Sequence, residues 1–230
     1  MELTKNELLH YWNYFRTLCK RLDITRQYID HSVEDNELKY KDVTSWEFQQ
    51  VLFLASMEFE NISKQICYHL DKSFNIRNSD IKKITKAILD KYPNIGQTEI
   101  ITDYQVLNPL KSWQIYQDSP NAKERVIGIP WWDDYDNLKH QSFKMFHLAT
   151  LNNAVYSLAS LMVIELYLMR EITGSVVISL EKPCDYFSSP YPGDILCTGE
   201  MALPDFSGEK NKNLVQDESL KICTIGSYKA

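Results

Sequence analysis

The chain has 230 residues, 44% of them apolar, and a net charge of −6, which is typical of a globular protein with one large domain or a domain plus an appendage. The acidic balance, with an isoelectric point near 5.4, argues against a protein that coats nucleic acid in bulk, because such binding needs clustered lysine and arginine. It does not exclude a small local phosphate site. The five cysteines are odd in number and form no C-x-x-C pair, so no zinc or redox motif is indicated. We expect a reducing, cytoplasmic location, and no apolar signal segment is visible at the N-terminus.

The part of the chain before Pro93 contains no glycine or proline and carries two long apolar stripes. The first stripe predicts a helix from Lys5 to about His31, and the second predicts a helix capped by Thr44 or Ser45, with a polar link between them. The stripes recur at three- and four-residue steps through Leu8, Tyr11, Phe15, Leu18, Leu22 and Ile29, and through Phe48, Leu52, Ala55, Phe59, Ile62 and Ile66. Two long helices of this kind favour an antiparallel pair.

A third, shorter helix is expected to start after Ser79 or Asp80 and to stop before Pro93. The following region, 93–129, lacks helical periodicity and contains two short apolar pairs, 100–101 and 106–107, that favour extended pieces.

Proline at position 130 suits the first residue of a further helix, because a helix does not use the N–H group that proline lacks there. The pattern then runs to about residue 171, as one helix or as two helices with a bend near Gln141 and Ser142. The apolar stretch 148–169 is interrupted by Asn152, Asn153 and Glu165. We therefore expect a buried core helix and no membrane span.

The fold class predicted is mainly α: a bundle of four to five helices over residues 1–172, with an irregular insertion at 93–129. Five of the seven glycines and four of the eight prolines follow Thr173, so residues 173–230 are expected to form a small β-rich or irregular C-terminal extension. The β-branched runs 176–178 and 222–225 favour a hairpin or short sheet there, and the polar stretch 210–217 favours a loop.

The first candidate site lies on the segment Trp131–His140, which combines two tryptophans, three acids, an amide, a lysine and a histidine. On a helix, Asp136 and Asn137 share a face with His140, so the carboxylate can hold one ring nitrogen and leave the other for acid–base chemistry. Lys139 and Lys144 can offer positive charge to an anion. The plainer alternative is a surface histidine with an ordinary acid partner one turn away.

The second candidate is the flank of the second helix that carries Glu58, Asn61 and Gln65, next to the apolar stripe. If this flank faces the helix of His140, the two groups form a polar pocket between helices, as is common in helical bundles. The alternative is a solvated flank.

The pairing of Glu58-x-x-Asn61-x-x-Lys64 with Trp132-x-x-Tyr135-Asp136-Asn137-Leu138-Lys139-His140 resembles the HEPN superfamily of bacterial helical proteins, over about residues 8–167. It is most similar to a branch with a Tyr-Asn-x-x-Lys-His motif before a long apolar helix. This resemblance implies a bundle that is usually dimeric, with polar residues of two helices in a shared cleft. It also implies relatives that are metal-independent endoribonucleases of toxin–antitoxin or phage-defence systems, in which a histidine moves protons at the ribose 2′-OH and an arginine steadies phosphate charge.

The chain departs from that pattern, because it has no arginine within reach upstream of His140; Asp136 occupies the natural place and position 142 is serine. Lys139 or Lys144 could substitute, although an ammonium lacks the two-pronged geometry of a guanidinium. Two functions are therefore open. One is an RNA-directed nuclease or degenerate relative, with His140, Asn137 and Lys139 catalytic and with Glu58, Asn61, Lys64, Asp136 and Lys144 in the binding cleft. The other is a noncatalytic interaction or scaffold protein in which these residues form a structural network.

No metal or other cofactor is expected. Two histidines seven residues apart, His140 and His147, do not match the Glu-x-x-His pattern of di-iron bundles. Trp131 and Trp132 could stack on bases, but tryptophans at a helix start are more often core residues. The expected partners are RNA, a cognate antitoxin or other protein, and a second copy of the chain in a homodimer.

Overall fold

The computed structural model describes residues 3–102, 105–116, 125–174, 177–179, 187–188 and 200–202. This part of the chain is mainly helical, which confirms the predicted fold class. Its α-helices are α1 (Lys5–Thr25), α2 (Trp46–Leu70), α3 (Ile81–Lys91), α4 (Pro130–His140) and α5 (Leu151–Thr173). Three short 3-10 turns accompany them, η1 (Ile76–Asn78), η2 (Ile95–Gln97) and η3 (Phe146–Leu148).

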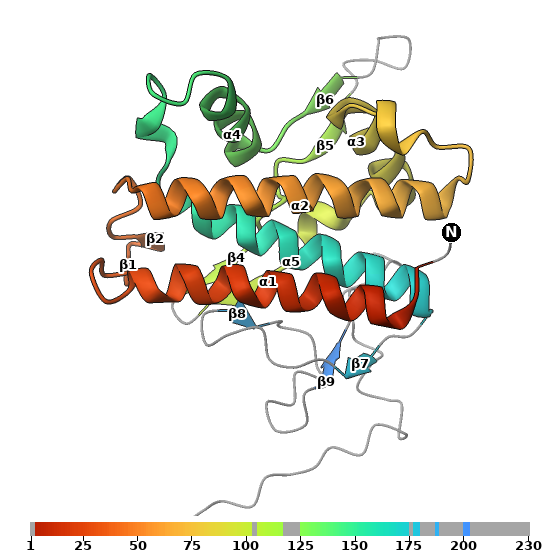
Figure 1. The fold of residues 1–230 in the computed structure, drawn as a ribbon, viewed down its shortest axis with the longest axis horizontal. Helices are drawn as coiled ribbons and strands as arrows, with labels where there is room; N and C mark the ends of the chain where they lie inside the picture. The colour runs from red at the N-terminus through yellow and green to blue at the C-terminus, as the bar shows by residue number, and fades with distance from the viewer. Residues whose placement is uncertain are drawn as a thin grey trace, which may run out of the picture.

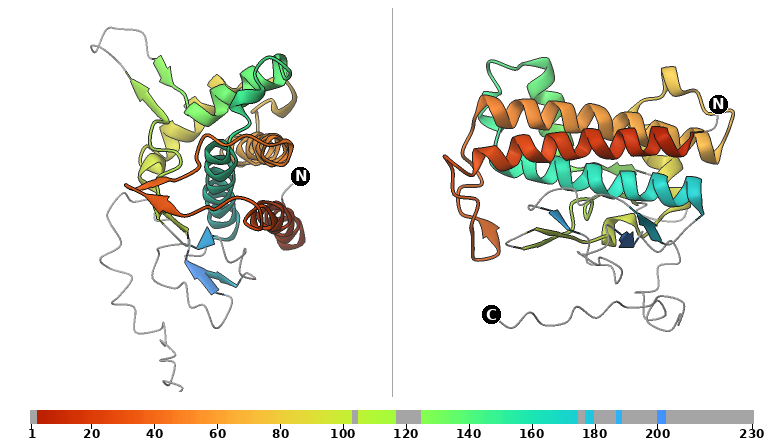
Figure 2. Two further views of the ribbon diagram at one scale, coloured as in Figure 1. Left: turned by 90° about the vertical axis from the view of Figure 1, so that its left-hand side faces the viewer. Right: turned by 60° about the horizontal axis from the view of Figure 1, so that its bottom comes forward.

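The bundle is built around α5, which lies against both α1 and α2 (Figures 1 and 2). Helices α2 and α5 start at the same end of the molecule, where Thr44 and Thr150 form a β-bridge, and α1 runs antiparallel to α2 (Figure 1). Within the described residues, α5 is the one helix long and apolar enough to cross a membrane, yet 89% of its most apolar window is buried inside the protein. Its apolar surface is therefore accounted for by packing, as expected for a core helix.

The first helix ends at Thr25, six residues earlier than the sequence predicted. The Thr25 hydroxyl donates a hydrogen bond to the carbonyl oxygen of Leu22 and lies 3.0 Å from Nε2 of His31. The chain turns tightly after Thr25, so that His31 folds back and is buried at the helix end. The apolar repeat at Ile29 comes from this turn, and the prediction of a helix to His31 was wrong for that reason.

The other helix boundaries agree with the capping signals in the sequence. Ser45 caps α2, because its hydroxyl accepts the N–H of Phe48 at 3.0 Å. Asp80 caps α3 in the same way through the N–H of Lys83, and α4 begins at Pro130. The segment from 130 to 173 is two helices, since α4 ends at His140 and α5 begins after its own cap, Thr150.

Short antiparallel strands occupy the connections. The link between α1 and α2 holds a hairpin of β1 (Val33–Glu34) and β2 (Glu37–Leu38), whose turn residues Asp35 and Asn36 both have positive φ, as a two-residue type I′ turn requires. The insertion between α3 and α4 contains β3 (Ile100–Thr102) with β4 (Val106–Leu107), and β5 (Gln114–Tyr116) with β6 (Arg125–Ile127). The two short extended pieces predicted there are β3 and β4.

Parts of the C-terminal segment are also in strands. β7 (Val177–Ser179) pairs with β9 (Glu200–Ala202), and β8 (Phe187–Ser188) pairs with β3. Phe187 is buried, with its ring centroid 6.2 Å from that of Phe15 on α1. Phe187 therefore packs directly against the bundle. The expected strand at 222–225 and loop at 210–217 lie outside the described residues.

Two of the five cysteines can be placed, and both behave as core residues. Cys19 and Cys67 are buried thiols on α1 and α2. Burial raises the pKa of the Cys67 thiol to about 12, so this sulfur stays protonated and unreactive at neutral pH. Cys184, Cys197 and Cys223 lie outside the described residues.

Phe59 of α2 is the centre of an aromatic cluster that joins α4 and β5 to the bundle. Its ring centroid lies 5.4 Å from that of Trp131, 5.9 Å from that of Trp132 and 5.7 Å from that of Trp113. The indole N–H of Trp113 donates to the Thr85 hydroxyl on α3. Phe59 therefore contacts α4 through Trp131 and Trp132, and it contacts Trp113, which is hydrogen-bonded to α3.

Phe59→Ala should therefore lower the free energy of unfolding by about 3–5 kcal/mol, as other buried phenylalanine truncations do. The matched control is Phe143→Ala, since the Phe143 side chain is 91% exposed and should change stability by less than about 0.5 kcal/mol. Urea denaturation followed by circular dichroism measures both values. Equal losses in the two variants would contradict the central role of Phe59.

Candidate functional site

Helix α4 buries its aromatic face and exposes its polar face. Trp131, Trp132, Tyr135 and Leu138 are buried, and the Tyr135 ring packs edge-on against Phe53 of α2, with 5.5 Å between the ring centroids. The two tryptophans are thus core residues. Asp136, Asn137, Lys139 and His140 are left exposed on the outer side.

The predicted ion pair of α4 is present on this outer side. Nε2 of His140 lies 3.4 Å from Oδ1 of Asp136, one turn earlier, and the two side chains are 67% and 58% exposed. Asn137 is exposed on the same turn. An accessible imidazole held by a carboxylate can take or give a proton at a bound ligand, although this pair forms no part of the described cavities.

An exposed aromatic and basic surface follows directly after His140. A turn closed by the N–H of Met145 and the carbonyl oxygen of Gln141 carries Phe143 and Lys144, both exposed. Phe146 in η3 then packs on Trp46, the first residue of α2, with ring centroids 4.3 Å apart, and Trp46 remains 63% exposed. We call the surface formed by Trp46, Lys139, His140, Phe143 and Lys144 the α4–η3 corner; it lies at one end of the bundle, at the upper left of Figure 1.

Lys139 is held at the edge of this corner by the aromatic ring beneath it. Its ammonium nitrogen lies 5.5 Å from the centroid of the Tyr135 ring, within the range of a cation–π contact. Among the described residues it has no ion-pair partner. Its positive charge is therefore available to an anionic ligand at the corner.

The second predicted group does not meet the first. The charge of Glu58 acts on Tyr11 and Tyr14 of α1 and on Glu165 of α5, and His10 of α1 acts on Glu58. Helix α2 lies between α1 and α4 (Figures 1 and 2). Since Glu58 and Asn61 face α1 while Phe53 and Phe59 face α4, the cleft expected between Glu58, Asn61 and His140 does not form, and that expectation was wrong.

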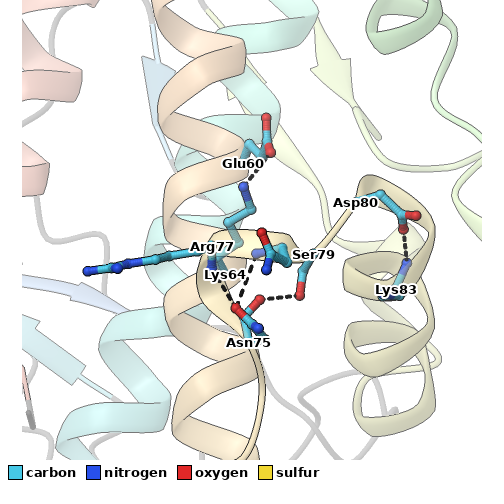
Figure 3. A network of polar contacts seen from close by, with 8 residues as sticks. Glu60, Lys64, Asn75, Arg77, Ser79, Asp80 and Lys83 are labelled. Carbon is cyan, nitrogen blue, oxygen red and sulfur yellow. Dashed lines mark hydrogen bonds and ion pairs between the residues drawn. The ribbon is translucent and has the colours of Figure 1, made fainter.

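Lys64 forms an ion pair on its own helix and does not face His140. Its ammonium group lies 2.6 Å from Oε1 of Glu60, one turn earlier on α2 (Figure 3). The neighbouring link into α3 is closed by local capping, in which Asn75 accepts the N–H groups of Arg77 and Asn78 (Figure 3). Lys64 therefore belongs to a polar flank beside the α2–α3 link and is not part of a cleft with His140.

Glu165 of α5 is a buried acid without a hydrogen-bond partner among the described residues, and in the sequence it appeared only as an interruption of an apolar run. It has no exposed surface. Burial, and then the charge of Glu58, raise the pKa of Glu165 well above its ordinary value. Burial also raises the pKa of Glu58, against the opposing effects of Asn61 and His10.

A polar cavity lies over the first turns of α5. It could not be predicted from the sequence, because its walls come from four separate segments of the chain. It consists of two adjoining hollows of about 470 and 490 Å³ that share Asn152, Asn153 and Tyr156. The first hollow is also lined by Glu37, Lys41, Asp42, Asp134 and His147, and the second by Asn108, Pro109, Lys111, Pro130 and Trp131. We call the two together the α5 cavity.

The N-terminus of α5 is not an anion site, although it borders this cavity. The N–H of Leu151 donates to the carbonyl oxygen of Val43, that of Asn152 to the carbonyl oxygen of Lys41, and that of Asn153 to the Thr150 hydroxyl. Because the donors that a helix start usually offers to phosphate are already satisfied, any ligand must be recognised by side chains.

Among the described residues, no group of three or more histidine, cysteine, aspartate or glutamate side chains is placed to hold a metal ion. No protein-family model, curated protein or solved structure matches the chain.

Glu165→Gln should stabilise the protein increasingly as the pH rises. A carboxyl group whose pKa is raised by folding keeps its proton in the folded state while the unfolded chain loses it, so its contribution to stability falls as the pH rises above about 4.5, the ordinary glutamate value. Thermal unfolding at pH 4.5 to 8 measures this effect, and at pH 8 the melting temperature of Glu165→Gln should exceed that of the wild type by at least about 2 °C.

The exposed Glu99→Gln is the matched control and should track the wild type across this pH range. A difference between Glu165→Gln and the wild type that did not change with pH would show that the carboxyl group titrates in the same way in both states.

Proposed function

We propose that this chain is a HEPN-like, RNA-directed protein that contacts single-stranded RNA at the α4–η3 corner. The observation that carries the proposal is the exposure of the Phe143 side chain, which is 91% exposed. In the sequence it follows Lys139 and His140 and precedes Lys144, and these three side chains are also exposed. An aromatic face beside cations is the arrangement with which proteins stack on bases and attract the phosphate backbone. Trp46 extends the aromatic surface at the same end of the bundle.

RNA fits this surface better than double-stranded DNA does. The corner offers two exposed aromatic rings and no helix that projects from the body to enter a major groove. Single-stranded segments expose both faces of their bases, and each stacked base contributes about 1–3 kcal/mol. The net charge of −6 indicates a local contact of a few phosphates, since the protein as a whole repels a polyanion.

A cleavage step would use His140 with its Asp136 partner. The imidazole would take the proton of a ribose 2′-OH, and the resulting oxygen would attack the adjacent phosphorus to form a 2′,3′-cyclic phosphate. The 5′-oxygen of the next nucleotide would leave with the proton returned by the imidazolium. Asn137 lies on the same exposed turn and could orient the ribose, while Lys139 or Lys144 would balance phosphate charge. The HEPN relationship further suggests a cytoplasmic protein of a defence or toxin–antitoxin system, with a cognate antitoxin as partner.

The second candidate is a noncatalytic interaction or scaffold protein. It is favoured by Asp136, which places a negative charge where the family pattern has an arginine, and by the separation of Glu58 and Asn61 from His140. In that case Phe143 and Trp46 would contact a partner protein. A degenerate relative that binds RNA without cutting it lies between the two candidates, and binding and cleavage must therefore be measured separately.

Fluorescence anisotropy with a labelled pool of single-stranded RNA, at low salt and with a chelator, measures binding. Phe143→Ala should weaken it by about 5- to 100-fold, the loss of one stacked base. Met57→Ala, which truncates an exposed apolar side chain of α2 outside the corner, should leave binding unchanged. Absence of binding by the wild type, or equal binding by Phe143→Ala, would contradict RNA contact at this surface.

Sequencing of the RNA ends after incubation measures cleavage. His140→Ala should remove all cleavage and keep the wild-type circular dichroism spectrum, because the His140 side chain is 67% exposed and makes no core contact. An RNA that is bound and never cut by the wild type would place the chain with the degenerate or noncatalytic relatives. Loss of folding in His140→Ala would instead mark this histidine as structural.

We also propose that the chain forms a homodimer through its long helices, as the family resemblance implies. Light scattering at micromolar concentrations should give twice the 27.0 kDa mass of the chain. A monomer mass across that range would exclude the dimer.

A further inference from the structure

We propose that the α5 cavity binds one uncharged nucleoside, with its base in the hollow lined by Trp131 and its ribose in the hollow lined by acids. This site is separate from the α4–η3 corner and does not depend on the RNA binding proposed there. Each hollow has the size of an ordinary small-ligand site, and the two adjoin at the shared residues Asn152, Asn153 and Tyr156.

The α5 cavity holds a hydrogen-bond acceptor with a fixed orientation, the side-chain oxygen of Asn153. The side-chain nitrogen of Asn153 donates to Oδ2 of Asp134 and to the carbonyl oxygen of Leu148, both at 2.9 Å. Both neighbours only accept at these atoms when Asp134 is ionised, so the amide cannot be flipped, and its Oδ1 is left as an acceptor. No donor among the described residues forms a hydrogen bond with the Asn153 Oδ1 atom. This oxygen is also not one of the buried side-chain atoms that lack a partner. A ligand N–H group can therefore pair with it.

A second amide in the same cavity repeats this arrangement. The side-chain nitrogen of Asn108 points to the carbonyl oxygens of Gln97 and Thr98, at 3.3 and 3.4 Å. Its Oδ1 is again left without a donor among the described residues, and Asn108 lines the second hollow. The cavity thus offers two positioned acceptors, which select a ligand with exocyclic amino or ring N–H groups over one that only accepts.

The apolar part of the wall is suited to a flat ring. Trp131, Tyr156, Pro109 and Pro130 line the second hollow together with these amides. The indole N–H of Trp131 has no accessible surface and no hydrogen-bond partner among the described residues, so the contribution of Trp131 to this wall is apolar. A heterocyclic base combines the flat apolar face with N–H donors and ring nitrogen acceptors, whereas a simple sugar lacks the first and a hydrocarbon lacks the second.

Charge in the first hollow favours a nucleoside over a nucleotide. Glu37, Asp42 and Asp134 line it, and the one lysine there, Lys41, lies 2.5 Å from the carboxylate of Glu37. Carboxylates accept hydrogen bonds from ribose hydroxyl groups but repel phosphate, and the backbone donors at the start of α5 are already used. Burial, followed by the charge of Glu37, raises the pKa of Tyr156, so its hydroxyl group stays protonated as a donor.

Isothermal titration with adenosine tests the site, with N6,N6-dimethyladenosine and adenosine monophosphate as comparison ligands. Adenosine should bind, the dimethylated base should bind less tightly by about 3- to 10-fold or more because it has lost its amino donors, and the monophosphate should also bind less tightly. Tyr156→Ala should weaken adenosine binding by about 5- to 100-fold through the loss of stacking. Asn152→Ala, whose side chain has no hydrogen-bond partner among the described residues, should weaken it by about 3- to 10-fold without disturbing the fold.

The matched controls are Asn13→Ala, an exposed asparagine of α1 outside the cavity, and Phe143→Ala at the α4–η3 corner. Both should bind adenosine as the wild type does, even where Phe143→Ala has lost RNA binding. The proposal is overturned if adenosine gives no heat at millimolar concentration, if Tyr156→Ala and Asn152→Ala bind it unchanged, or if the monophosphate binds more tightly. Loss of adenosine binding in Phe143→Ala alone would move the ligand to the corner. Tyr156→Phe, which keeps the ring, should retain most of the affinity and shows whether Tyr156→Ala acts through stacking.

Discussion

The fold depends on the burial of α5 on every side. From Leu151 to Met169 nearly all of its side chains are inaccessible, so α1, α2 and the short strands of the insertion must cover a single apolar rod. Burial of this apolar surface is the main favourable term in folding. It also explains why a 23-residue apolar helix can belong to the core of a protein and not to a membrane. Both candidate functional surfaces lie at the end of the bundle where this helix begins.

The α4–η3 corner and the α5 cavity are linked by one short segment. Residues 141–150 carry Phe143 and Lys144 outward, place Phe146 on Trp46, and return with His147 and Leu148 in the wall of the cavity. The carbonyl oxygen of Leu148 also fixes the orientation of Asn153. One segment therefore contributes both to an exposed surface suited to a polymer and to a hollow of a size suited to a single small molecule.

The sequence predicted the helices well because their signals are local. Stripe periodicity and the caps at Ser45, Asp80 and Pro130 depend on residues within one or two turns of each other. It could not predict which neighbour each flank meets, since that depends on the packing of the whole bundle. Glu58 and Asn61 border the apolar stripe as expected, yet the helix opposite them is α1. The aromatic face of α4 packs instead on Phe53 and Phe59, on another side of α2.

The first turn of α5 has a further consequence for how this protein can change. Its N–H groups are held by the main-chain carbonyl oxygens of Lys41 and Val43, in the link that follows the β1–β2 hairpin. Main-chain pairing is indifferent to side-chain identity, so this link can vary widely in sequence. It tolerates little variation in length, because an insertion or deletion there would leave two donors unpaired at the start of the core helix. Divergence in this region should therefore proceed by substitution and keep the spacing between hairpin and helix.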